Sequence, residues 1–418
     1  GYRDSRIPDE PERRLAEVLQ GLVEDVAPCA VNVASPYFVG HMTSAIPFFM
    51  VHLQTLAAAL HQNPVKLETS KVVAVHERQV LAKLHRLVFR RSPGFYRRHI
   101  QRPESTLGCF VADGTLANLT ALWVARNRCL PPRPGFAGVE AEGMAAALAA
   151  HGVARMAVLV SERGHFSLRK ACGVLGIGHA QVIPVPVDRR QRLDAAALAR
   201  LLKRHHAPAR GLRVMAVVGI AGTTETGSVD PLPAIAVLCA RHGVHFHVDA
   251  AWGGPTLMSD AYAPLLDGIQ QADSVTIDGH KQLYMPMGCG MVFFRDPAAM
   301  DAVAYHAAYV NRPGSADLGI RHLEGSRPAA SLVLGGALAI MGRRGYAVLI
   351  EHGIDTARRF AAAIARRPLF QVTTAPQLNI LTYRLVPPHL RAGLQSTDPE
   401  TRRSANAAAP ARSIHRGH

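Results

Sequence analysis

Lys281 is the residue whose type most directly suggests chemistry. It is one of six lysines in a chain of 418 residues that carries 41 arginines, and it stands in the apolar stretch SVTIDGHKQLYMPMGCGMVFF. Arginine would supply charge there but would not release its proton near neutral pH, whereas a lysine amine can do so and then attack a carbonyl carbon. Lys281 is therefore a candidate nucleophile for a carbonyl compound.

Further polar residues stand where predicted strands end. The segments are ERGH at 162–165, GTT at 222–224, DAAWGG at 249–254 and DGHK at 278–281. In open α/β sheets, binding sites form beyond the carboxyl ends of the strands. We therefore expect these four segments to meet at one edge of a sheet.

A lysine, an aspartate and a histidine beside a phosphate site match the needs of pyridoxal phosphate. Lys281 would bind the cofactor aldehyde through its amine, and Asp249 would keep the pyridine nitrogen protonated. His165 offers a flat group for the ring face. Gly114 and Thr115 begin a predicted helix whose N-terminal N–H groups would bind the phosphate.

Each of these residues, taken singly, also has an ordinary structural interpretation. Lys281 could be a surface lysine, Asp249 could cap a turn, and His165 could be a hydrogen-bonded structural histidine. Gly114-Thr115 is a common way to begin a helix. Their occurrence together at successive strand ends favours the catalytic interpretation.

Strands and helices alternate in the region that must position these residues. Short β-branched runs predict strands at 156–161, 180–187, 213–220, 244–250, 274–278 and 290–294. Periodic apolar residues predict helices at 10–30, from 49 to 60, at 68–89, at 115–127 and from 331, with one more strand at 378–386. This alternation indicates an α/β fold with a mostly parallel sheet.

The chain divides into four predicted segments. An N-terminal helical and substrate-loop segment covers 1–70, a large α/β domain 71–330, and a partial small C-terminal domain 331–390. The tail at 391–418 is rich in Ala, Arg, Ser and Pro and has no periodicity, so we expect it to be disordered.

Composition narrows the class of protein. The net charge is +16, but the basic residues are spread along the chain without a recognition motif, so we expect no nucleic-acid partner. No run of 18 apolar residues predicts a membrane span. Six cysteines without a C-x-x-C pattern indicate reduced thiols in a cytoplasmic protein, with no metal site.

Several segments together resemble a known family. HVDAAWGG followed by TIDGHKQLYMPMGCG resembles the group II pyridoxal-phosphate decarboxylases, which include glutamate and aromatic amino acid decarboxylases. SERGHFSLRKACGVLGIG and AGTTETGSVDPLPAIA are similar to the family's ring-stacking and Gly-Thr-Thr segments. GHMTSAIPFF, QNPVKLETSK, GTLANLTALWVARN and LEGSRPA resemble the aspartate 1-decarboxylase subgroup.

This resemblance, which covers about residues 10–390, implies a fold and a reaction. The fold would be that of the fold-type I pyridoxal-phosphate-dependent transferases. The reaction would be α-decarboxylation of an acidic L-amino acid, first of all L-aspartate to β-alanine and carbon dioxide, as a precursor supply for pantothenate. Family members are homodimers with shared sites, so a homodimer is expected.

The resemblance also implies roles around the cofactor. Ala251 would cover the ring face opposite His165. His280 would lie near the phosphate, and Thr223 near the ring hydroxyl or the substrate carboxylate. Ser326 would reach the phosphate of the neighbouring subunit.

On the substrate side the resemblance points to two loops. His41, Thr43 and Ser44 would face the substrate. Tyr309 would lie on a mobile loop and return a proton to the carbon that carbon dioxide leaves. A basic side chain, such as that of Lys66 or of Arg327, would then find a use in binding an acidic substrate.

Two departures from the family pattern keep alternatives open. Ala112-Asp113-Gly114-Thr115 stands where the family has Ser-Gly-Gly-Thr, and a carboxylate near a phosphate is unfavourable unless it turns away. The sequence after LTYR is also shorter than in the family. The substrate could instead be glutamate, cysteine sulfinate or an aromatic amino acid, or the same fold could catalyse another reaction. The chain could also be a truncated inactive relative or a basic nucleic-acid binder.

Overall fold

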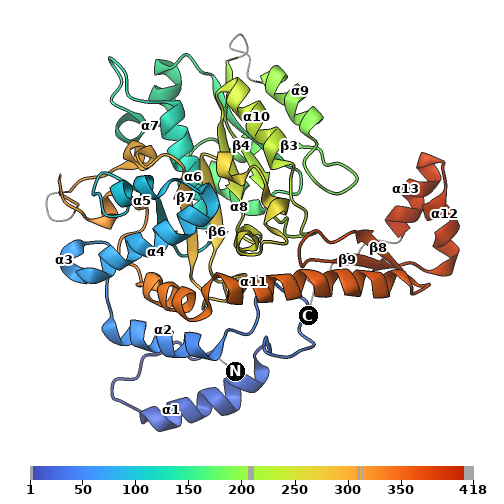
Figure 1. Ribbon diagram of the computed structural model, residues 1–418, viewed down its shortest axis with the longest axis horizontal. Helices are drawn as coiled ribbons and strands as arrows, with labels where there is room; N and C mark the ends of the chain where they lie inside the picture. Colours follow the sequence, from blue (N-terminus) through green and yellow to red (C-terminus); the bar gives the residue numbers. More distant parts are fainter. Residues whose placement is uncertain (1–2, 206–210, 308–310, 313, 409–418) are drawn as a thin grey trace.

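A seven-stranded sheet forms the centre of the computed structural model, which describes residues 3–205, 211–307, 311–312 and 314–408 (Figure 1). The strands are β1 (Gly108–Val111), β2 (Arg155–Ser161), β3 (Val182–Val185), β4 (Leu212–Ile220), β5 (His245–Asp249), β6 (Ser274–Asp278) and β7 (Gly290–Phe294). Their order is β1-β7-β6-β5-β4-β2-β3. Only β7 runs antiparallel to its neighbours, β1 and β6. The predicted mostly parallel α/β fold is confirmed.

Helices cover both faces of this sheet (Figure 1). They are α4 (Val72–Phe89), α5 (Pro93–His99), α6 (Gly114–Cys129), α7 (Val139–Ala150), α8 (Phe166–Val174), α9 (Ala195–His205) and α10 (Leu232–His242). Alternate residues of β4 show the two layers: Val217 packs in the cluster that includes α9 and α10, while Ala216 and Val218 pack in the cluster that includes α6 and α8. Burial on both faces explains why these strands are nearly all apolar.

Helical segments flank the sheet domain at both ends of the chain. On the N-terminal side they are α1 (Leu15–Gly21), which continues as a π-helical turn (Leu22–Val26), α2 (Phe48–Leu60) and α3 (Leu67–Ser70). On the C-terminal side they are α11 (Ala330–Ala365), the hairpin β8 (Phe370–Thr374) and β9 (Thr382–Leu385), α12 (Arg391–Gln395) and α13 (Pro399–Ala408). Single 3-10 turns occur at Ala27–Cys29, His179–Gln181, Gly254–Met258, Ala263–Leu266, Ile269–Gln271, Ala299–Val303, Leu318–Arg321 and Pro388–Leu390.

The structure contains elements that the sequence analysis did not predict, among them the helices α5 and α7. Strands β1 and β8 were not predicted. The segment from 391, for which disorder was expected, forms α12 and α13 over most of its described part, which ends at 408. The predicted domain boundaries at 70 and 330 stay a prediction, and all seven strands of the sheet lie between them.

Helix α11 is long and apolar enough to cross a membrane by length and composition, and it is the one such helix in the described part of the chain. The core helix of a soluble protein can meet the same criterion. Several of its side chains, such as Val333, Leu334 and Tyr346, are fully buried in the main hydrophobic core. The helix also breaks at Gly342, where φ is +60°.

Candidate active site

A cavity of about 260 Å³ opens at the carboxyl ends of the central strands. Asp249 ends β5, Lys281 follows β6, and His165 follows β2, and all three line this cavity. The N-terminus of α6, with Gly114 and Thr115, closes the same space. The structure therefore brings together the four groups that the sequence singled out at separate strand and helix ends.

Asp249 is fixed in the cavity by two hydrogen bonds. Its Oδ2 atom accepts from Nδ2 of Asn118 at 2.9 Å, and its Oδ1 atom accepts from the backbone N–H of Ala251 at 3.1 Å. The residue is only 6% exposed. Asn118 also lines the cavity and was missed by the sequence analysis, although its place one helical turn beyond Gly114 was a usable signal.

Lys281 forms an ion pair at the edge of the cavity. Its Nζ atom lies 3.0 Å from Oδ2 of Asp278, whose side chain is 3% exposed. Nε2 of His280 lies 3.7 Å from the same oxygen, and Nδ1 of His280 is 2.8 Å from the carbonyl oxygen of Cys289. Burial raises the pKa of Asp278, and the charge of Lys281 lowers it in part.

The N-terminus of α6 provides backbone donors. Asp113 caps this helix, since its Oδ1 atom accepts from the N–H of Leu116 at 2.9 Å. The Asp113 carboxylate is thus engaged with the helix end, although it still lines the cavity. The first-turn N–H groups of Gly114 and Thr115 are the kind that an α-helix leaves without intrahelical partners.

Gly114 is required by a close approach. A Cβ atom at this position would lie 2.7 Å from Oδ2 of Asp278, whose side chain is buried. The glycine thus lets the start of α6 reach the segment that carries Lys281.

His165 lies on the cavity wall as a neutral ring. Its Nδ1 atom is 2.9 Å from the hydroxyl of Ser167 and accepts from the Ser167 N–H at 3.3 Å. Burial lowers the pKa of His165, and the nearby carboxylate of Asp249 opposes this in part. A neutral flat ring at this wall can stack on an aromatic cofactor.

The two segments that follow β4 and β5 differ from expectation in one residue. Ala251, which follows β5, lines the cavity as expected. Thr223 does not: its hydroxyl is buried against the hydroxyl of Thr226 at 2.7 Å and accepts from the Ser228 N–H. Gly222 and Thr224 line the cavity in its place, because the loop turns the side chain of Thr223 inward.

A second cavity of about 380 Å³ adjoins the first. The two share Met42, Trp252 and Lys281 as lining residues. His41, Thr43 and Ser44, which the sequence assigned to the substrate side, line this second cavity, and Nδ1 of His41 is 2.9 Å from the Thr43 hydroxyl. The loop before α2 therefore lines the cavity that shares Lys281 with the first one and contains no residue of α6.

Besides Thr223, one further predicted site residue among those the structure describes, Ser326, does not line these cavities. Ser326 lines a different cavity, next to Met287 and Gly288, and its hydroxyl accepts from Nδ2 of Asn63 at 3.0 Å. Tyr309 lies outside the described residues.

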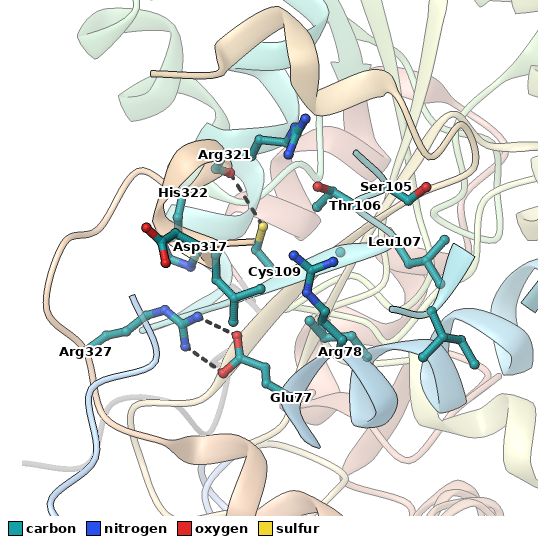
Figure 2. A pocket seen from close by; sticks show the side chains of 14 residues that line it. Glu77, Arg78, Ser105, Thr106, Leu107, Cys109, Asp317, Arg321, His322 and Arg327 are labelled. Atoms are coloured by element: carbon teal, nitrogen blue, oxygen red, sulfur yellow. Dashed lines mark hydrogen bonds and ion pairs between the residues drawn. The ribbon is translucent and has the colours of Figure 1, made fainter. Parts of the chain in front are cut away.

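The two basic residues suggested for an acidic substrate are engaged elsewhere. Figure 2 shows Arg327 directed at Glu77 beneath a small cavity that also contains Cys109 and His322. Two hydrogen bonds join Arg327 to Glu77, and both side chains are buried. Lys66 pairs with Glu68. Neither basic residue lines the cavities around Lys281.

Comparison with known proteins decides the family. Residues 2–386 match the pyridoxal-dependent decarboxylase conserved domain. The chain belongs to the pyridoxal-dependent decarboxylase family. It is 47% identical to the aspartate 1-decarboxylase of Aliivibrio fischeri over 393 residues, which are 94% of this chain and 71% of that protein. It is 31% identical to the L-2,4-diaminobutyrate decarboxylase of Rhizobium meliloti, over 85% of this chain and 66% of that protein.

A solved decarboxylase-family structure agrees. The crystal structure of mouse CSAD in apo form has a TM-score of 0.80 and 26% identity, and the match covers 96% of this chain and 79% of that chain. The pyridoxal-dependent decarboxylases thus share their fold with this chain, as the sequence predicted. The chain is a pyridoxal-phosphate-dependent amino acid decarboxylase.

The residues present fit this cofactor. A partly buried lysine amine, a buried carboxylate and a neutral imidazole line one cavity with the start of a helix of 16 residues. Oδ1 of Asp278 is buried without a hydrogen-bond partner among the described residues, beside the lysine that would hold the cofactor. Buried polar atoms are usually hydrogen-bonded, so a polar group of a bound cofactor would supply the partner that this oxygen lacks.

Proposed function

We propose that this enzyme decarboxylates L-aspartate at its α-carbon and releases β-alanine and carbon dioxide. The 47% identity to an aspartate 1-decarboxylase, over 94% of the chain, is the observation that carries this proposal. The relatives at about 30% identity include decarboxylases of other amino acids, such as L-2,4-diaminobutyrate and cysteine sulfinic acid. The product would serve as a precursor for pantothenate.

The cofactor-binding roles are proposed from the cavity geometry. When bound, pyridoxal phosphate supplies a protonated ring that takes up the electron pair left by departing carbon dioxide. Lys281 would hold the cofactor covalently through Nζ. Asp249, already fixed by Asn118 and the Ala251 amide, would keep the ring nitrogen protonated, and His165 would lie against the ring.

The phosphate would lie at the start of α6. The amides of Gly114 and Thr115 and the ring of His280 would surround it, helped by the positive end of the helix dipole. Near the ring hydroxyl or the substrate carboxylate, Thr224 takes the role first assigned to Thr223, because Thr224 lines the cavity.

The substrate would enter from the second cavity. His41, Thr43 and Ser44 would contact it there, and Trp252 and Met42 form the passage to Lys281. The apolar side chains of Trp252, Ile380 and Leu381 in the second cavity would keep water from the carbon that loses its carboxylate. Tyr309 is proposed, from the family resemblance alone, as the residue that returns a proton to that carbon.

A homodimer is the proposed assembly. Apolar side chains of α1, of the π-helical turn that follows it and of α2 are exposed in the single chain, among them Leu15, Val23 and Phe48, each at least two-thirds exposed. A surface of this kind usually marks an interface. Ser326 would then approach the neighbouring subunit's phosphate. Sedimentation velocity that shows only a monomer would contradict this proposal.

We further infer a cytoplasmic enzyme. All six cysteines are free thiols in the structure, as expected where thiols stay reduced. Fractionation of cells that express the tagged chain would check this location.

The decisive experiment combines a spectrum with a product assay. Purified protein with added pyridoxal phosphate should show a visible band above that of the free cofactor, and Lys281→Ala should lack it. L-Aspartate, L-glutamate, L-cysteine sulfinate and L-2,4-diaminobutyrate are then supplied in turn. β-Alanine formed from L-aspartate at the highest kcat/KM supports the proposal, whereas a higher kcat/KM with another of these amino acids replaces L-aspartate as the substrate.

A further inference from the structure

Arg163 stands at the one place where an acidic substrate could meet a guanidinium near Lys281. It lies in the turn between β2 and α8 and lines the cavity that holds Lys281 and Asp249. Among the described residues that line either cavity, it is the sole arginine. Lys281 is committed to the cofactor, so it cannot also neutralise a substrate side chain.

The guanidinium of Arg163 is held by two polar side chains. Nε donates to Oε1 of Gln191 at 2.9 Å, and Nη1 donates to Oε2 of Glu225 at 3.0 Å. Glu225 belongs to the loop after β4 and lines the second cavity, the one that holds His41 and Thr43. The pair therefore joins the wall of the cofactor cavity to the wall of the substrate-side cavity.

This ion pair can be exchanged at little cost. The side chains of Arg163 and Glu225 are 36% and 60% exposed, and ion pairs in such surroundings contribute little because water competes for both partners. A guanidinium matches a carboxylate in shape and can bind it through two parallel hydrogen bonds. A substrate carboxylate is chemically the same group as the one that Glu225 presents.

We propose that Arg163 binds the side-chain carboxylate of the substrate. In the free enzyme Glu225 occupies that place, and Arg163 releases Glu225 when the substrate binds. This inference rests on the proposed function, since it requires an acidic substrate. A neutral amino acid has no group that can replace Glu225, so the pair would also select against neutral substrates. Arg163 is thus a specificity residue, and Glu225 competes with the substrate for it.

Four variants, one of them a control, test the proposal. In Arg163→Met we expect KM for L-aspartate to rise about tenfold or more, with kcat changed much less, because a binding contact kept through the reaction is lost. In Glu225→Gln we expect KM to fall by about two- to fivefold, because the internal competitor is gone. Arg169→Met, on the exposed side of α8, should leave KM unchanged. Arg163→Lys should recover part of the loss.

Product inhibition shows which of the two carboxylates of aspartate Arg163 binds. β-Alanine keeps the side-chain carboxylate of aspartate and lacks the α-carboxylate. Inhibition by β-alanine should therefore weaken in Arg163→Met as much as aspartate binding does, while inhibition by propylamine, which has no carboxylate, should not change. Unchanged inhibition by β-alanine would overturn the proposal, because Arg163 would then bind the α-carboxylate or nothing.

The remaining outcomes are also decisive. A wild-type enzyme that turns over L-aspartate, with the same KM in Arg163→Met, overturns this inference alone. A wild-type enzyme that forms no β-alanine overturns the proposed function itself. If Arg163→Met does not fold, Glu225→Gln still decides, since a KM that rises or stays equal in that variant contradicts the competition.

Discussion

Asn118 holds Asp249 through a hydrogen bond of 2.9 Å, from Nδ2 of the amide to Oδ2 of the carboxylate. The other end of the same amide accepts from the Thr276 hydroxyl at 2.9 Å and bonds Nε2 of His247 at 3.0 Å. Burial lowers the pKa of His247 to about 4, so its ring is neutral and Nε2 can donate. One amide therefore orders β5, β6 and α6 around the carboxylate that would meet the cofactor.

Replacing Asn118 by alanine should weaken both the fold and the cofactor site. The change leaves the buried groups of His247, Thr276 and Asp249 without a shared partner, at a cost of about 1–3 kcal/mol in the free energy of unfolding. Thr120→Val, on the same helix but outside the cavity, is a matched control. Thermal melting and an absorbance titration with pyridoxal phosphate check the two effects. Equal cofactor affinity in both variants would show that Asn118 does not position Asp249.

Asp278→Asn should speed the covalent capture of pyridoxal phosphate by Lys281. The carboxylate lies 3.0 Å from Nζ and holds it in an ion pair that must break before the amine can attack an aldehyde. We expect a capture rate at pH 7 that is higher by roughly threefold or more. Mass spectrometry of borohydride-trapped protein measures the rate, with Lys281→Ala as the blank. Slower capture would mean that Asp278 serves mainly to orient the lysine.

The strand-end residues could be predicted because of a general property of parallel sheets. The carboxyl ends of β2, β5 and β6 lie at one edge, so His165, Asp249 and Lys281 had to converge once the strands were recognised. Strand β1 escaped recognition because its four residues, all buried, show no alternation. Short apolar runs of this kind carry little periodic signal.

The misplaced residues depended on contacts that the sequence does not show. Thr223 and Thr224 are adjacent and chemically alike, and only the turn of the loop decides which one faces the cavity. Arg327 was a reasonable cation for an acidic substrate until its partner was known. That partner, Glu77, lies 250 residues earlier in the chain.

Breaking the pair of Glu77 and Arg327 from one side should be costly. The side chains are 1% and 5% exposed, so either partner left alone would be an uncompensated buried charge (Figure 2). We expect Arg327→Met to reduce the free energy of unfolding by about 3–5 kcal/mol. The double variant Glu77→Leu with Arg327→Met should lose much less than the sum of the single losses. Urea denaturation of the four proteins measures this coupling, and additive losses would contradict it.

Acid should destabilise the protein through buried histidines, of which His85 is a clear case. Its Nε2 donates to the Phe294 carbonyl and its Nδ1 bonds the Tyr96 hydroxyl, both at 3.0 Å. Burial lowers the pKa of His85 to about 4 from an ordinary value of 6.5. The unfolded chain therefore takes up this proton first as the pH falls. The stabilising contribution is complete above pH 6.5 and is lost progressively between 6.5 and 4.

The His85→Gln variant isolates that contribution. Between pH 7 and pH 5, His85 should account for a loss of about 2 kcal/mol in the free energy of unfolding. Glutamine can still donate and accept but cannot take up a proton, so the variant should lose less stability over this range by about that amount. His52→Gln, at an exposed position of α2, is the control and should behave as the wild type does. Denaturation curves at pH 7, 6 and 5 give the comparison. An identical pH dependence in His85→Gln and in the wild type would mean that His85 keeps its ordinary pKa in the folded protein.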